Sequence, residues 1–192
     1  MAQHDPCEPA RITTVGTRQV YVNDWMSVRE DAIRRQDGST GIYGVVDKPS
    51  YALVIPLDGD RVRLVEQYRY PIGLRRWEFP QGTAPGQDGI AAERLAAREL
   101  QEETGLLAGT MTELGMLDLA PGLSTQRGHV FLATGLTEGE HAREPEEQDM
   151  RSAWFTRSEF EGMITRAELT DAQSIAAYTL LLLHERGGER RP

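Results

Sequence analysis

The stretch RELQEETGL contains three glutamates in a span of five residues, Glu99, Glu102 and Glu103. In a helix each residue advances by about 100°, so the three carboxylates fall within an arc of about 100°. Like charges at these spacings repel by roughly a few tenths of a kcal/mol per pair. Two explanations fit, and the spacing alone does not separate them. The cluster is either a solvated acidic helix face or a set of oxygen ligands for a hard divalent cation, Mg²⁺ or Mn²⁺.

These glutamates need a helix to bring them together, and the surrounding residues predict one from about residue 90 to residue 104. The stretch is rich in Ala, Leu, Glu and Arg, and Gly105 follows it as a C-terminal stop. Ahead of the helix, the stretch WEFPQG is typical of a short strand that enters a loop rich in Gly and Pro.

The remaining chain is dominated by strands, with two further helices near the C-terminus. Strand patterns and hairpin turns are expected in four stretches, which are residues 19–46, 50–70, 112–119 and 128–136. Helices are expected in TRSEFEGMI and DAQSIAAYTLLLLHE, each opened by a Thr or Asp cap. Irregular alternation of strands with only three helices favours an α+β layered domain over a repeated βαβ array.

The composition excludes several classes of function. A formal net charge of -9 argues against affinity for nucleic acid or anionic membranes, because phosphate groups favour basic surfaces. Acidic proteins that act on phosphorylated small molecules usually recruit cations. The lone Cys7 cannot form an internal disulfide or a cysteine-rich zinc site. No signal peptide or apolar run of about 18 residues is visible, so we expect a cytoplasmic protein.

The stretch RELQEETGL resembles the second half of the Nudix box, R-E-U-x-E-E-x-G-U with U apolar, without a gap. In Nudix hydrolases these glutamates hold the metals that bridge a diphosphate. The resemblance implies two or three Mg²⁺ ions, with Mn²⁺ as a substitute, and Glu99 and Glu103 as the main ligands. Glu102 would be a further ligand or a catalytic group that positions water. The carbonyl of Gln81, just before Gly82, would complete the shell of one metal.

The first half of the box departs from the family pattern. The interval from Gly82 to Arg98 is two residues longer than usual, and Ile90 stands where the family carries a glutamate. Gln87 or Asp88 is expected to take the role of that missing glutamate. We expect activity to survive, because that first glutamate is mostly structural or auxiliary in the family.

Nearly the whole chain resembles the ADP-ribose pyrophosphatase branch of the family. In LDLAPGLSTQ, Pro121 lies fifteen residues after Leu106, a placement typical of that branch, and VEQYRYP precedes WEFPQG as it does there. The resemblance implies a Nudix fold, an α/β/α sandwich with a mixed sheet, for residues 48–192. A small N-terminal antiparallel β segment, residues 1–47, would precede it, form a homodimer and contribute to the ligand site.

Four residues match substrate-binding positions of this branch. Arg69 matches an arginine that contacts the diphosphate or the terminal ribose, and its alternative is a surface arginine on a strand. Trp25 and Tyr43 match aromatic rings that sandwich adenine, for which stacking is physically suitable. Core or dimer packing is the alternative for both rings. Pro121, which marks the branch, is grouped with them.

The catalytic base should come from outside the box if all three glutamates serve the metals. The branch places a glutamate on a loop before a late strand, which here is EPEEQD, residues 144–149. Alignment puts Glu146 at the catalytic position, with Glu147 as the near alternative. A solvated acidic loop is the other explanation.

The resemblance therefore implies Mg²⁺-dependent hydrolysis of a nucleoside diphosphate sugar, with ADP-ribose giving AMP and ribose 5-phosphate. GDP-mannose or another sugar nucleotide is a close alternative, since the same rings would stack guanine. A non-catalytic nucleotide-sensing Nudix domain is a rival from another class, although such proteins commonly lose the box glutamates. An acidic interaction module would require the box match to be accidental.

Overall fold

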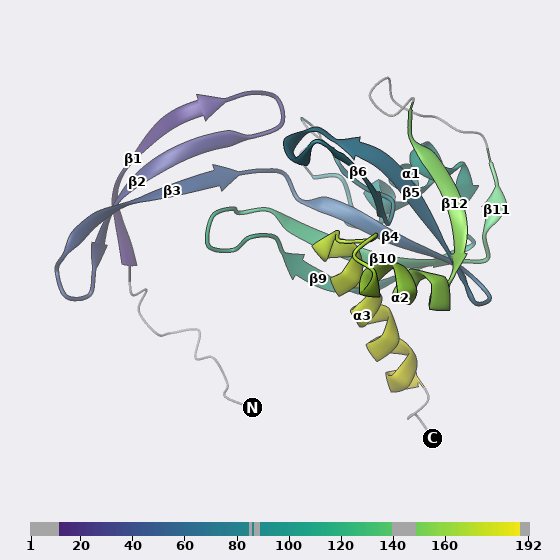
Figure 1. Cartoon of the computed structure of the whole chain (residues 1–192). Helices are drawn as coiled ribbons and strands as arrows, with labels where there is room; N and C mark the ends of the chain where they lie inside the picture. Colours follow the sequence, from purple (N-terminus) through teal and green to yellow (C-terminus); the bar gives the residue numbers. More distant parts are fainter. Residues whose placement is uncertain (1–11, 85, 87–88, 140–148, 189–192) are drawn as a thin grey trace. The chain divides into compact units, whose positions relative to one another are not determined.

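The computed structural model describes residues 12–84, 86, 89–139 and 149–188 (Figure 1). This part of the chain divides into two compact units, each built on its own sheet. The first unit runs to Lys48 and also includes Ala120–Gln126. The second unit comprises Pro49–Leu119 and the chain from Arg127 onward.

The first unit is a three-stranded antiparallel sheet in the order β1-β2-β3. Its strands are β1 (Ile12–Val22), β2 (Ser27–Arg35) and β3 (Thr40–Asp47). The β1–β2 turn is fixed by the side chain of Asn23, whose Oδ1 accepts the N–H groups of Trp25 at 3.0 Å and Met26 at 2.9 Å. The β2–β3 turn contains Gly38 at φ 83, a left-handed conformation that favours glycine.

The segment Ala120–Gln126 groups with this sheet, although we expected it inside the catalytic domain. The reason is a backbone exchange with the end of β3. The N–H of Val46 donates to the carbonyl of Leu123 at 2.9 Å, and Thr125 donates to the carbonyl of Val46 at 3.1 Å. These bonds give the segment a parallel bridge to the sheet.

The second unit is built on a mixed sheet in the order β12-β5-β4-β10-β9, with β6 paired to β5 and β7 to β4. The pair β4–β10 is parallel and the other pairs are antiparallel. Its strands are β4 (Tyr51–Asp58), β5 (Arg61–Arg69), β6 (Leu74–Glu78), β7 (Gln81–Thr83), β9 (Thr110–Asp118), β10 (Arg127–Thr134) and β12 (Arg151–Thr156). Two short strands, β8 (Leu106–Leu107) and β11 (Thr137–Glu138), pair separately, and a 3-10 turn (Tyr70–Ile72) links β5 to β6.

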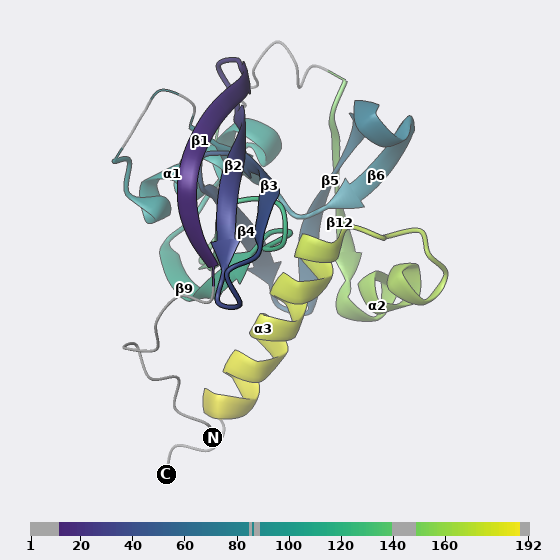
Figure 2. The same cartoon turned by 90° about the vertical axis from the view of Figure 1, so that its left-hand side faces the viewer.

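Helices cover both faces of this sheet, so its central strand β4 is apolar and buried from Tyr51 to Pro56. Ala52 and Val54 point to one face and pack with α1 (Ala92–Thr104). Leu53 and Ile55 point to the other face and pack with α2 (Arg157–Thr165) and α3 (Ala172–Gly188). Figure 2 shows α1 on one side of the sheet and α2 and α3 on the other. The layers are those of the predicted sandwich.

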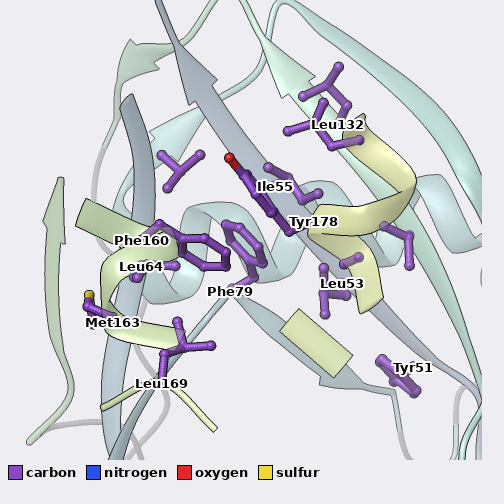
Figure 3. Close-up of a cluster of buried hydrophobic side chains, with 14 residues drawn as sticks. Tyr51, Leu53, Ile55, Leu64, Phe79, Leu132, Phe160, Met163, Leu169 and Tyr178 are labelled. Carbon is purple, nitrogen blue, oxygen red and sulfur yellow. The ribbon is translucent and has the colours of Figure 1, made fainter. Parts of the chain in front are cut away.

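Aromatic rings fill the core between the sheet and the two C-terminal helices (Figure 3). The ring of Phe79, which follows β6, stacks on Phe160 of α2 with centroids 5.2 Å apart. Phe160 in turn contacts Tyr178 of α3 at 4.6 Å. This core anchors the chain between β6 and β7, which leads into the candidate site.

The helix ends follow the predicted chemistry. Helix α1 begins two residues later than expected and stops at Gly105, whose φ is 73 and whose N–H donates to Gln101 O at 2.8 Å. Thr156 forms a capping box with Glu159 at the start of α2, and Asp171 accepts the N–H of Ser174 at 2.8 Å at the start of α3. Among the described residues, no helix is long and apolar enough to span a bilayer.

Candidate active site

Helix α1 places the glutamates of RELQEETGL at its border with the sheet. Leu95, Ala96 and Leu100 face the core. Glu99 and Glu103, one turn apart, are buried beside that apolar face at 4% and 1% exposure. Glu102 is half-buried. A buried carboxylate is costly unless other groups hydrogen-bond to it, so the contacts of these side chains define the site.

Strand β7 supplies the contacts of Glu99 and Glu103. The backbone N–H of Gln81 donates to Oε2 of Glu103 at 3.0 Å. At the next residue, a Cβ on Gly82 would overlap the carboxylate of Glu99. Gly82 is therefore required by the close approach of the Glu99 side chain to the strand, and not by a left-handed backbone.

Arg98 contacts two carboxylates of the cluster, those of Glu99 and Glu102. Its Nη2 donates to Oε1 of Glu99 at 3.1 Å and to the carbonyl of Thr83 at 3.3 Å, and its Nε lies 3.4 Å from Oε2 of Glu102. Neighbouring helix residues point apart, but the length of the arginine lets its guanidinium turn back to both glutamates. This pairing offsets part of the like-charge repulsion and orients the carboxylates.

The chemistry of these donors suits a hard cation. Carboxylate oxygens and a backbone carbonyl are ligands that Mg²⁺ and Mn²⁺ prefer. Because Gly82 has no Cβ, the carboxylate of Glu99 can lie directly against strand β7. In the described ranges, no three Asp, Glu, His or Cys side chains already converge as a metal site. Ligation by Gln81, Glu99, Glu102 and Glu103 therefore stays a prediction.

Glu78, at the end of β6, is a buried carboxylate that the sequence did not single out. It is 2% exposed. Arg69, the predicted diphosphate contact, reaches it with Nη2 at 2.6 Å from Oε1 and Nε at 3.2 Å from Oε2. The side-chain amide of Gln81 also donates to Oε2 at 3.3 Å. Burial raises the pKa of Glu78, and the Arg69 guanidinium opposes this shift.

The predicted base-stacking residues lie in the first unit. Trp25 is at the β1–β2 turn and is 59% exposed, while the Tyr43 hydroxyl donates to the carbonyl of Gly122 at 2.9 Å. Tyr43 is therefore beside the Pro121–Gly122 segment. Neither ring is buried within its unit, which argues against simple core packing.

Trp25 and Tyr43 are carried by backbone positions that lie well apart in the sheet of the first unit. Asp47 pairs with Ser27 near the turn that carries Trp25, and Tyr43 is four residues farther along β3. That separation is about 13 Å along the strand. Binding of a base by both rings stays a prediction.

The predicted catalytic bases Glu146 and Glu147 lie outside the described residues, as do Gln87 and Asp88. Asp149 is the first residue after this loop that the structure describes. Its Oδ2 lies 2.6 Å from Nη1 of Arg75, and its carbonyl accepts Nη2 at 2.9 Å, so the chain that follows the loop is tied to β6.

Comparisons with known proteins find two domain families along the chain. Residues 47–178 match the NUDIX domain, and residues 12–46 match the nucleoside diphosphate sugar hydrolase N-terminal domain. The chain is 33% identical over 178 residues to an ADP-ribose pyrophosphatase of Mycobacterium tuberculosis, covering 92% of this chain and 83% of that protein. It is 26% identical over 174 residues to an ADP-ribose pyrophosphatase of Bacillus subtilis, covering 90% and 93%.

A solved structure, the crystal structure of an ADP compounds hydrolase, shares the fold. The TM-score is 0.82 at 19% sequence identity, and the likeness covers 94% of this chain and 97% of that one. With the domain match, it confirms the predicted α+β fold with its N-terminal antiparallel sheet.

The contact between Gly82 and Glu99 predicts the effect of one methyl group. In Gly82→Ala the new Cβ displaces the Glu99 carboxylate, and we expect the Kd for Mn²⁺, measured by titration calorimetry, to rise about tenfold or more. Gly187→Ala is the matched control, because nothing lies within 4 Å of a Cβ at that position. Unchanged Mn²⁺ affinity in Gly82→Ala would contradict a metal role for Glu99.

Proposed function

The chain belongs to the Nudix hydrolases, and from that premise we propose that it hydrolyses the diphosphate bond of ADP-ribose or a closely related nucleoside diphosphate sugar. One observation carries the proposal. The box glutamates Glu99 and Glu103 are buried on α1 and lie against β7. Fixed carboxylates of this kind are what a site needs to bind a diphosphate through metal ions. The names of the similar proteins support ADP-ribose as the first substrate to test.

The residues of the site have separate roles in binding metal and phosphate. Glu99 and Glu103, with Glu102 and the carbonyl of Gln81, would hold two or three Mg²⁺ ions. When bound, such ions supply Lewis-acid neutralisation of the phosphate charge. Arg69 adds a fixed positive charge for the diphosphate, and a guanidinium suits the planar, bidentate recognition of phosphate oxygens.

The reaction consumes one water and breaks one bridging bond. The water oxygen bonds to one phosphorus as the bond from that phosphorus to the bridging oxygen breaks, and ADP-ribose gives AMP and ribose 5-phosphate. A loop carboxylate, Glu146 or Glu147, would take the proton from the water. Trp25 and Tyr43 would bind the base by stacking, with Pro121 beside Tyr43 shaping that surface.

A substrate panel tests the proposal. ADP-ribose, GDP-mannose, diadenosine polyphosphates and NADH are incubated with Mg²⁺, and the products are separated by chromatography. We expect AMP and ribose 5-phosphate from ADP-ribose, and no turnover with EDTA. Glu103→Gln should lower kcat/KM by about a thousandfold or more, since the metals provide much of the transition-state stabilisation.

Glu168→Gln is the control for the panel, because Glu168 is half-exposed and pairs with Arg166 at the protein surface. Turnover in EDTA, or a Glu103→Gln variant as active as the wild type, would refute the metal-dependent mechanism. A preference for GDP-mannose would show that this sugar nucleotide is the substrate, and the proposed mechanism would stay the same.

Substitution of the loop glutamates tests the proposed base. Glu146→Gln should lower kcat strongly with little change in KM, because proton removal contributes mainly in the transition state. Glu147→Gln and the double variant cover a shift of one residue in the alignment. If the double variant keeps kcat within about a factor of three, roughly 0.7 kcal/mol, the base lies elsewhere.

The sheet of the first unit supports a homodimer. It exposes large apolar side chains on β1 and β3, which are Ile12, Val15, Val20, Tyr21, Val22 and Ile42. A segment of this size buries too little surface to stand alone, and contiguous exposed apolar patches mark interfaces.

Light scattering at micromolar concentration should therefore give twice the chain mass of 21.5 kDa. Val20→Asp with Val22→Asp places two charges among the exposed apolar side chains of β1 and should shift the mass toward a single chain. A wild-type protein that is monomeric under these conditions would disprove the dimer.

A further inference from the structure

Glu78 and Arg69 form a fork between the ends of β6 and β5. Both nitrogens on one edge of the guanidinium face the carboxylate, at 2.6 Å and 3.2 Å. In the β5–β6 register Glu78 is opposite Val65, so its side chain shares a face with Arg69 four residues along. The sheet thus orients both partners.

The two partners of this fork differ in their exposure. The Glu78 side chain is 2% exposed and that of Arg69 is 39% exposed. A buried ion pair is weak evidence for stability, because the cost of desolvation can exceed the attraction between the charges. A carboxylate that is buried while its arginine stays partly open is therefore better explained by the orientation that it gives to the arginine.

The same carboxylate also reaches the metal side of the site. Its Oε2 accepts the side-chain amide of Gln81 at 3.3 Å, and the backbone N–H of Gln81 donates to Glu103 at 3.0 Å. One continuous set of contacts therefore runs from Arg69 through Glu78 and Gln81 to Glu103. These side chains come from β5, β6, β7 and α1, and Glu78 is the member that joins the arginine to the rest.

We propose that Glu78 is a positioning residue, which holds the Arg69 guanidinium toward the substrate diphosphate and sets its place relative to Gln81 and Glu103. This inference rests on the proposed diphosphate hydrolysis. An arginine presents five N–H donors in a fixed fork. With one edge held by Glu78, the exposed remainder is oriented for phosphate oxygens at little cost in side-chain entropy.

The role predicts a specific kinetic pattern with Mg²⁺ and ADP-ribose. Glu78→Gln keeps the shape but loses the charge, and we expect KM to rise about tenfold with kcat within about threefold, as for binding shared by ground and transition states. Arg69→Gln should raise KM at least as much. The double variant should be no worse than Arg69→Gln alone, because Glu78 acts through that arginine.

Two further variants separate positioning from packing. Glu78→Asp retains the charge but removes a methylene group, so its KM should lie between those of the wild type and Glu78→Gln. A packing role predicts the opposite order, because the smaller residue leaves a cavity. Glu185→Gln is the matched control. Glu185 holds Arg157 in a fork of 2.9 Å and 2.7 Å in the same unit, and its loss should leave KM unchanged.

The outcomes distinguish this inference from the function beneath it. A wild-type protein that hydrolyses no compound of the panel refutes the proposed function. The positioning role is refuted if the wild type is active and Glu78→Gln leaves KM unchanged. It is also refuted if the increases in KM caused by Glu78→Gln and Arg69→Gln multiply in the double variant. If Glu78→Gln alone fails to fold, the double variant removes both charges, and its KM must still equal that of Arg69→Gln.

Discussion

The close approach of β7 to α1 is the constraint on which the site depends. Glu103 accepts a backbone N–H from the strand, and the Glu99 carboxylate occupies space that only a glycine at position 82 leaves open. Buried carboxylates destabilise a fold unless they are hydrogen-bonded. The strand therefore hydrogen-bonds Glu103 and lies directly against Glu99, while Arg98 hydrogen-bonds Glu99, and these contacts fix where the carboxylates lie. Because Gln81 pairs with Leu53 on the central strand β4, the core of the second unit holds this arrangement in place.

Much of the second unit was predictable because its determinants are local. The helix ending at Gly105, the caps at Thr156 and Asp171, and the strand entering Gly82 each follow from neighbouring residues. The box pattern is local too, since its glutamates are spaced by single turns of one helix. The resemblance carried by this stretch, together with shorter motifs along most of the chain, therefore predicted both the fold and the class of reaction.

Features made by distant residues were not predictable in the same way. In the sequence Glu78 has no feature that separates it from other strand residues. Its contact with Arg69 depends on the β5–β6 register, and its contact with Gln81 depends on the turn that follows β6. The grouping of Ala120–Gln126 with the first unit also depends on backbone bonds to Val46, for which no side-chain pattern exists. Backbone pairing between remote segments leaves little trace in a single sequence.

The parallel pairing of β4 with β10 carries a consequence for the order of folding. Tyr51 pairs with Gly128, and the ring of Tyr51 fills the space that a Cβ on Gly128 would need. These partners are 77 residues apart, and β5, β6, β7, α1 and β9 lie between them. Non-local pairing of this kind gives a high contact order and slows folding. The helix that carries the glutamates packs mainly on β4 and β7, which pair with each other, so these contacts can form before the long loop closes and brings β10 to β4.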